Sequence, residues 1–422
     1  MNKIEQSQTR NMEEIKEHLL HEAELDPHHV STVEEETKRL EPATDDDSSL
    51  LRRHEINAGD SVIKELTPKP AGKYKFIRSV GFGGMKAVIQ VKDKDTTRNV
   101  AMAIIPDSAD RPQSDINRFI QEARITARLE HPNIVPVHDI GVDTNGVPYF
   151  TMKLLRGRTL STILKKMRDD DYKTLKEFDL TRLLRIYVKI LNGVVFAHSK
   201  KIIHLDLKPD NVHIGDFGEV LIIDWGLARF IGAPEDIEDN YDGEMIAFPG
   251  MSPAGDYTLD GITKGTPGYM APEQAAGQNR LKDERSDIYA LGALLYVILT
   301  FESPLTGRPV NEILAETIRG NIKFPDPENQ KRSIPAAMQA VVLKAMSRYP
   351  EERYQTATEL RDDIFAFLGG FAPKAEDASS LKKTYLFFNR NWMATLFLMT
   401  LLLLLAICIW IINLYFDGQL QL

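Results

Sequence analysis

Cysteine is nearly absent from this chain, since Cys408 is the only one among 422 residues. A single thiol cannot form a disulfide within the chain, and it cannot supply a zinc site built from several cysteines. An excess of basic residues is also missing, because the formal net charge is −9. Binding to nucleic acid through bulk charge is therefore not expected.

The negative charge is concentrated in the first fifty residues, where 14 Asp and Glu accompany 5 Lys and Arg. The rest of the chain is balanced, with 47 acidic and 47 basic residues. Large apolar residues are also scarce before residue 74, so this part has little surface to bury in a core. We expect residues 1–73 to form an acidic, disordered arm.

Charged residues are missing altogether from the twenty residues between Met393 and Ile412. As a helix this segment would be about 30 Å long, which is the thickness of the hydrocarbon layer of a bilayer. A buried core helix is the alternative reading. Five consecutive leucines and the flanking Trp392 and Tyr415 favour a transmembrane helix.

The flanks of this segment differ in charge, because basic residues precede it and only Asp417 follows it. The preceding basic residues are Lys374, Lys382, Lys383 and Arg390. The positive-inside tendency then predicts a single-pass membrane protein with the body of the chain in the cytoplasm. Residues 369–392 are expected to form a juxtamembrane linker, and residues 413–422 a short C-terminal tail.

Residues 74–368 have the length and apolar content of a large folded body. Its first part has the period-two alternation of strands, and its second part has helical periodicity. The predicted strands are Tyr74–Val80, Lys86–Val91, Asn99–Ile105, Ile134–Val142 and Tyr149–Lys153, interrupted by a helix at Asp115–Leu129. The predicted helices of the second part are Leu180–His198, Ser286–Thr300, Ile334–Met346 and Ala357–Phe367. We expect an α+β fold with a small β-rich lobe followed by a larger helical lobe.

Two aspartate-led motifs lie eighteen residues apart in the second part of this body. Asp206 opens the sequence DLKPDN, and Asp224 opens DWG. The interval has room for a hairpin of two short strands, the second of which would end next to Asp224. A closer DFG sequence at 216–218 leaves too little chain for that hairpin, and we interpret it as the turn of the hairpin.

Other motifs occur around this pair in a definite order. The sequence GFGG at 81–84 follows an apolar strand, where glycines let backbone amides approach a phosphate closely. Taken alone, such a glycine cluster is equally typical of a hairpin turn. The remaining motifs are QEA at 121–123, HPN at 131–133, GTPGYMAPE at 265–273, SDIYALG at 286–292 and PEERY at 350–354.

In this order the motifs resemble those of eukaryotic-type protein kinases, and most closely those of bacterial membrane-anchored serine/threonine kinases. The resemblance covers residues 74–368 and implies the bilobal protein kinase fold, with ATP and Mg²⁺ as cofactors and proteins as substrates. It implies that Asp206 accepts the proton of the substrate hydroxyl and that Lys208 neutralises the moving phosphoryl group. Asn211 and Asp224 would bind the metal. Whether the protein self-associates or phosphorylates itself is left open.

The resemblance also implies supporting roles in the larger lobe. Thr266 would buttress Asp206 and Lys208. Glu273 would pair with Arg353, and Asp287 would tie the catalytic loop to its central helix. Residues of the smaller lobe would contact the nucleotide: Val80, Gly81, Gly83, Gly84, Val88, Ala101, Met152, Lys153 and Leu155.

The chain departs from the family pattern on one strand, where the expected lysine is replaced by Ala103. A second departure accompanies it, because Lys86 stands where the glycine loop has its third glycine. Since side chains alternate along a strand, Lys86 shares a face with Val88, and Ala103 shares the same face of the neighbouring strand. Lys86 and Ala103 are then expected to lie about one strand spacing of 4.8 Å apart. We therefore predict that Lys86 replaces the missing lysine and is oriented by Glu122.

This exchange resembles the with-no-lysine kinases, in which a lysine of the glycine loop takes over the same role. The alternative is that Lys86 is a solvated loop residue and the protein is a pseudokinase scaffold. Such a scaffold would bind nucleotide or protein partners without catalysis. A small-molecule kinase is disfavoured, because the segment 265–273 resembles the peptide-binding platform of protein kinases.

A further departure is Leu205, which replaces the arginine that precedes the catalytic aspartate in many family members. That arginine usually pairs with a phosphate on the activation loop. We therefore expect that single-site phosphorylation of this loop does not switch the protein on. Alanine at Ser252, Thr258 and Thr263 together should leave kinase activity nearly intact in a phosphate-transfer assay. A loss greater than about tenfold would contradict this expectation.

Overall fold

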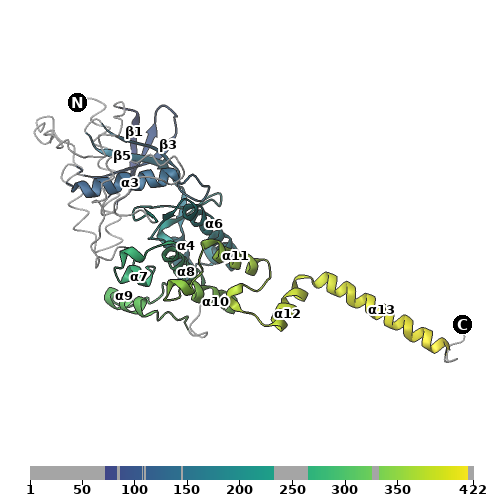
Figure 1. Cartoon of the computed structure of the whole chain (residues 1–422). Helices are drawn as coiled ribbons and strands as arrows, with labels where there is room; N and C mark the ends of the chain where they lie inside the picture. The colour runs from purple at the N-terminus through teal and green to yellow at the C-terminus, as the bar shows by residue number, and fades with distance from the viewer. Residues whose placement is uncertain are drawn as a thin grey trace, which may run out of the picture. The chain divides into compact units, whose positions relative to one another are not determined.

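The computed structural model describes residues 72–82, 86–106, 108, 111–143, 146–231, 265–325 and 332–416. Residues 1–71, Gly83, Gly84, residues 232–264 with the three loop hydroxyls, and residues 417–422 lie outside the described residues, and so do the predictions made for them. The chain divides into two units. The N-terminal unit extends to Gly157 and includes residues 223–226, and the C-terminal unit begins at Arg158. Figure 1 shows the elements of both units in sequence colours.

The N-terminal unit is built on an antiparallel sheet with the strand order β1-β2-β3-β5-β4. Its strands are β1 (Tyr74–Phe82), β2 (Ala87–Asp93), β3 (Asn99–Ile104), β4 (Val137–Val142) and β5 (Pro148–Lys153). All five predicted strands are therefore confirmed, with ends that shift by up to three residues. The helix α3 (Gln113–Arg128) confirms the predicted helix between β3 and β4.

Strand β3 separates two apolar clusters because its side chains alternate between the faces of the sheet. Val100 and Met102 pack with Tyr149 on one face. Ala103 packs on the other face with Phe119 and further apolar residues of α3. This packing fixes α3 against the sheet, and it places the α3 residue Glu122 on the same side as Ala103.

The C-terminal unit is mainly helical. Its long helices are α6 (Leu180–Ser199), α8 (Glu284–Thr300), α10 (Ala336–Ala345) and α11 (Ala357–Leu368), which confirm the four predicted helices. Every residue of α8 from Ser286 to Leu299 is buried. A helix that is buried all round belongs to a core, so α8 forms the centre of this unit.

Shorter elements connect these helices. They are β6 (Gly157–Thr159), α4 (Leu160–Arg168), α5 (Tyr172–Glu177), β7 (Ile202–Ile203), η4 (Pro209–Asn211), β10 (Arg229–Phe230), α7 (Pro272–Ala275), η6 (Asn279–Leu281), α9 (Val310–Arg319), η8 (Pro350–Glu352) and η9 (Lys374–Glu376). The predicted hairpin is present as β8 (Val212–Gly215) and β9 (Val220–Ile222), which pair antiparallel. Phe217 lies in the turn between them and is 96% exposed, so the DFG sequence is a turn, as predicted.

Two further helices end the described chain, α12 (Ser380–Arg390) and α13 (Trp392–Phe416). The stretch Thr395–Asn413 of α13 is long and apolar enough to cross a membrane, and none of it is buried. This agrees with the predicted transmembrane helix and disfavours a core helix. Cys408 is exposed on this helix.

A buried ion pair joins two distant segments of the C-terminal unit. Arg353, fully buried, donates to both carboxylate oxygens of Glu273, over 3.0 and 2.9 Å. Its other N–H groups donate to backbone carbonyls of Arg285, Ser347 and Arg348. All five donors of the guanidinium are therefore used.

Replacing Arg353 with methionine should lower the free energy of unfolding by about 3–5 kcal/mol, because the Glu273 carboxylate would remain buried without its cation. The measurement is denaturant unfolding of the full chain in detergent. Arg319→Met is the matched control, since the Arg319 side chain is 63% exposed and exposed ion pairs contribute little. Equal losses in the two variants would contradict a special role for the buried pair.

Candidate active site

The catalytic-loop motif places four polar side chains in one hydrogen-bonded network within the C-terminal unit. Asp206 accepts a hydrogen bond from the Thr266 hydroxyl over 2.7 Å with one carboxylate oxygen. The other oxygen accepts from the Asn211 amide over 3.1 Å and lies 2.9 Å from the Lys208 ammonium. Lys208 also donates to Thr266 over 2.8 Å, which closes the network.

The backbone next to Asp206 is strained and held from two sides. Leu205 has a φ of +64°, a left-handed conformation that leucine rarely adopts. Its N–H donates to Asp287 over 2.8 Å, and its carbonyl accepts from the Gln274 side chain over 3.0 Å. Asp287 also accepts from the N–H of His204. These bonds compensate the strain and fix the loop on α7 and α8.

Asp287 is buried, and a histidine of α6 completes its contacts. His198 lies 2.9 Å from the carboxylate through its Nε2 atom. Burial opposes the ionisation of Asp287, but His198 and the backbone N–H of His204 outweigh it and hold the pKa of Asp287 below its usual value. A charged Asp287 therefore connects α6, α8 and the catalytic loop.

A second polar cluster lies within the N-terminal unit. The Lys86 ammonium donates to Glu122 of α3 and, over 2.9 Å, to Asp224. Glu122 is buried, and 24% of the Lys86 side chain is exposed. Gly226 permits this approach, because a Cβ atom there would lie 3.3 Å from a Glu122 oxygen and 3.4 Å from Asp224.

The charge of Lys86 follows from these neighbours. Burial alone would lower its pKa, but the carboxylates of Glu122 and Asp224 outweigh burial and raise the pKa above its usual value. Lys86 is therefore an ammonium ion at neutral pH. Burial and, to a smaller extent, the charge of Asp224 raise the pKa of Glu122, while Lys86 opposes them.

The strand register corrects one detail of the predicted exchange between Lys86 and Ala103. The residue directly opposite Ala103 is Val88, and Lys86 precedes the first residue of β2. The lysine and the alanine are therefore not cross-strand neighbours at one strand spacing. Lys86 approaches Glu122 from beyond the end of β2, which the length of its side chain allows.

Comparison with known protein families agrees with the presence of these two polar clusters, around Asp206 and around Lys86. The model of the protein kinase domain family matches residues 74–365. The chain belongs to the protein kinase domain family. The matched range begins with β1 and ends within α11, and it includes both clusters.

Curated relatives of this kinase domain are named serine/threonine-protein kinase PknD. The protein from Protochlamydia amoebophila is 36% identical over 322 residues, which are 74% of this chain and 32% of the relative. Those from Chlamydia caviae and Chlamydia pneumoniae are each 38% identical, over 71% and 72% of this chain and 31% and 32% of the relatives. The chain thus spans about a third of the length of these relatives.

The described residues expected to contact nucleotide lie on the sheet of the kinase domain, except for Leu155, which follows it. Val80 and Gly81 belong to β1, Val88 to β2 and Ala101 to β3. Ala101 pairs with Met152 of β5, so these two lie side by side. Lys153 ends β5, and Leu155 follows it, half-buried.

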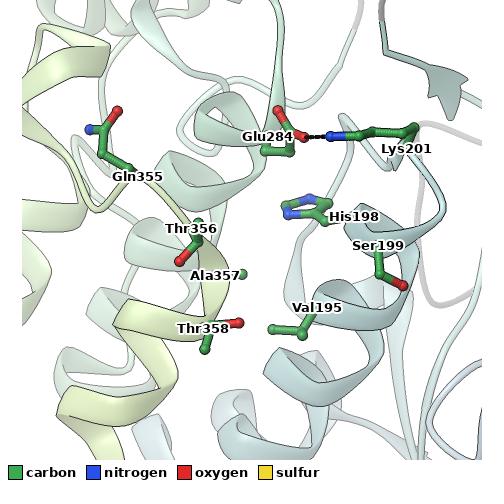
Figure 2. A pocket seen from close by; sticks show the side chains of 9 residues that line it. All are labelled: Val195, His198, Ser199, Lys201, Glu284, Gln355, Thr356, Ala357 and Thr358. Carbon is green, nitrogen blue, oxygen red and sulfur yellow. Dashed lines mark ion pairs between the residues drawn. The ribbon is translucent and has the colours of Figure 1, made fainter.

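A depression of about 340 Å³ lies elsewhere on the kinase domain, in its C-terminal unit (Figure 2). It is lined by Val195, His198, Ser199, Lys201, Glu284, Gln355, Thr356, Ala357 and Thr358. Lys201 and Glu284 form an ion pair of 3.6 Å at its edge. None of the residues predicted to bind nucleotide or to transfer phosphate lines it, although His198 connects it to Asp287.

Sequence reasoning missed two residues that hold the catalytic loop, Gln274 and His198. Gln274 directly follows the predicted Glu273, and this position in the motif was its only signal. His198 was the last residue of a predicted helix, where a histidine is unremarkable. Their importance comes from contacts across 69 and 89 residues of sequence, which no local pattern indicates.

Proposed function

We propose that the protein is a serine/threonine kinase that transfers the γ-phosphoryl group of ATP to protein hydroxyls. The observation that carries this proposal is the network around Asp206. An ionised carboxylate has about four lone-pair positions, and three are used by Thr266, Asn211 and Lys208. One position remains for the hydroxyl of a substrate. The relatives named serine/threonine-protein kinases support the same activity.

In the proposed reaction the substrate oxygen forms a bond to the γ-phosphorus while the bond to the bridging oxygen breaks and ADP leaves. Asp206 takes the proton of the hydroxyl. Lys208 offers positive charge to the phosphoryl group during the transfer. Thr266 holds both side chains, so their relative position is set before the substrate binds.

Lys86 is proposed to replace the missing strand lysine, because its ammonium already contacts Glu122. In this family a lysine held by the α3 glutamate binds the nucleotide phosphates. Lys86 has the charge and the glutamate partner that this role requires. The pseudokinase alternative has no observation in its favour, since Asp206, Lys208, Asn211 and Asp224 are all retained.

Asn211 and Asp224 are proposed to hold Mg²⁺. Their donor atoms fit this ion, because magnesium prefers oxygen ligands and usually adds water and phosphate oxygens. The Asn211 amide nitrogen is bonded to Asp206, which leaves the amide oxygen as the ligand atom. Bound magnesium would neutralise phosphate charge. Among the described residues no group of three His, Cys, Asp or Glu side chains offers a metal site made of protein ligands alone.

The transmembrane role of α13 is also a proposal, supported by its apolar length and by the basic residues before it. It would anchor the kinase domain, taken as residues 74–368, to the cytoplasmic side of the cell (inner) membrane. Protein substrates are expected from the family.

The test is incubation of the full chain in detergent with labelled ATP, magnesium and a generic basic protein. Label should pass to serine and threonine, which phosphoamino-acid analysis identifies. No transfer under any condition, with ATP still raising the melting temperature, would favour the pseudokinase.

A further inference from the structure

Helix α12 exposes an apolar stripe that no described residue covers. Leu381, Tyr385 and Phe388 are 85%, 66% and 49% exposed. Their spacing of four and three residues places them on one face of the helix. Scattered exposed apolar residues are common, but a continuous stripe indicates an interaction surface.

The other side of α12 contacts the rest of the C-terminal unit. Lys382 forms an ion pair with Glu376, and the Arg390 guanidinium lies 3.7 Å from the centre of the Phe371 ring. Leu386, between these two positions on the helix surface, is half-buried. At 3.6 residues per turn these three side chains lie away from the stripe. The stripe is therefore directed away from the protein.

The position of α12 in the chain indicates what covers the stripe. Only Asn391 separates α12 from α13. The 25 residues of α13 extend about 37 Å, which exceeds a hydrocarbon layer of about 30 Å. The first turn of α13, with Trp392, would therefore lie among the lipid headgroups, where tryptophan is favoured. The C-terminal end of α12, at Arg390, would lie at the same depth.

The charges of this region match one kind of membrane. No acidic residue lies between Asp377 and Asp417, whereas α12 contains Lys382, Lys383 and Arg390. Basic residues on the polar side of a helix with an apolar face favour binding to anionic lipids. Here Lys383 and Arg390 have no acidic partner on α12 itself, whereas Lys382 pairs with Glu376. We propose that α12 lies in the headgroup layer of an anionic bilayer, with Leu381, Tyr385 and Phe388 inserted. This inference rests on the proposed membrane anchoring by α13.

Spin labelling of the full chain tests the proposal. In a Cys408→Ser background, single cysteines replace Tyr385, Phe388, Lys383 or Leu402, and the labelled proteins are reconstituted in phosphatidylcholine–phosphatidylglycerol vesicles. Lys383 is the matched control, because it is exposed on α12 away from the stripe. Leu402 reports separately on insertion of α13. Each label is then exposed to oxygen, which enters lipid, and to a nickel chelate, which stays in water.

The ratio of oxygen to nickel accessibility should be at least about threefold higher at Tyr385 and Phe388 than at Lys383, because lipid excludes the chelate. Equal ratios at the three sites, with Leu402 protected from nickel, would overturn this inference and leave the anchor intact. Protection of the stripe from both reagents would also overturn it, because another protein surface would then cover α12. Nickel access at Leu402 would refute the anchor and the inference together.

Discussion

Replacing Asp206 with asparagine should reduce phosphoryl transfer by about 10²–10⁴-fold, because an amide cannot accept the proton of the substrate hydroxyl. Asparagine has the same shape, and its oxygen can still accept the hydrogen bond from Thr266. The loss should therefore appear in the rate of transfer and leave nucleotide binding nearly unchanged. The measurements are the initial rate with labelled ATP and the rise in melting temperature on adding ATP.

Asp210→Asn is the matched control for this variant. Asp210 belongs to the same loop and carries the same charge, but its side chain is exposed and lies outside the network around Asp206. The control should transfer phosphate at the rate of the unaltered protein. If Asp206→Asn kept that rate as well, another group would have to take the proton, and the proposed role of Asp206 would be wrong.

Replacing Lys86 with methionine should reduce transfer by about 10²–10³-fold, as expected when one preorganised charge is removed from a reacting phosphate. Methionine keeps most of the length of the side chain but removes the ammonium. Glu122 would then be buried without its cation, so its pKa should rise further and its carboxylate would be neutralised more easily. Kinetics at several ATP concentrations would separate weaker nucleotide binding from slower transfer.

Two further variants make the Lys86 result specific. Lys92→Met alters an exposed lysine of β2, the strand that Lys86 precedes, and should have little effect. The double variant Lys86→Gly with Ala103→Lys returns the ammonium to the position usual in the family, next to α3. Partial recovery of transfer is expected. Full activity in Lys86→Met, combined with loss in Asp206→Asn, would keep the kinase assignment and reject the relocated lysine.

Much of the architecture was predictable because its signals are local. Strands β1 to β5 and helices α3, α6, α8, α10 and α11 have clear apolar periodicity, and they were found with small errors at their ends. Helices α4, α5, α7, α9 and α12 were missed. Helix α12 buries no residue, so no core imposes a helical pattern on its apolar positions. Helix propensity alone is a weak guide to such a helix.

The site residues were predicted from the order of the motifs, but only part of their geometry could be predicted from the sequence. Alternation correctly put Lys86 on the side of Glu122, but the register was needed to show that Val88 and not Lys86 faces Ala103. The left-handed backbone at Leu205 could not be foreseen, because leucine has no preference for it. Such strain is imposed by distant partners such as Asp287.

The two backbone hydrogen bonds that hold Leu205 bear on how the enzyme is controlled. Both of its backbone groups are engaged by Asp287 and Gln274, and its side chain is buried, so the loop bearing Asp206 keeps its shape without any added phosphate. The neutral side chain of Leu205 offers no positive charge to a phosphate on the activation loop. We therefore expect that no upstream kinase is needed to set the geometry of this loop.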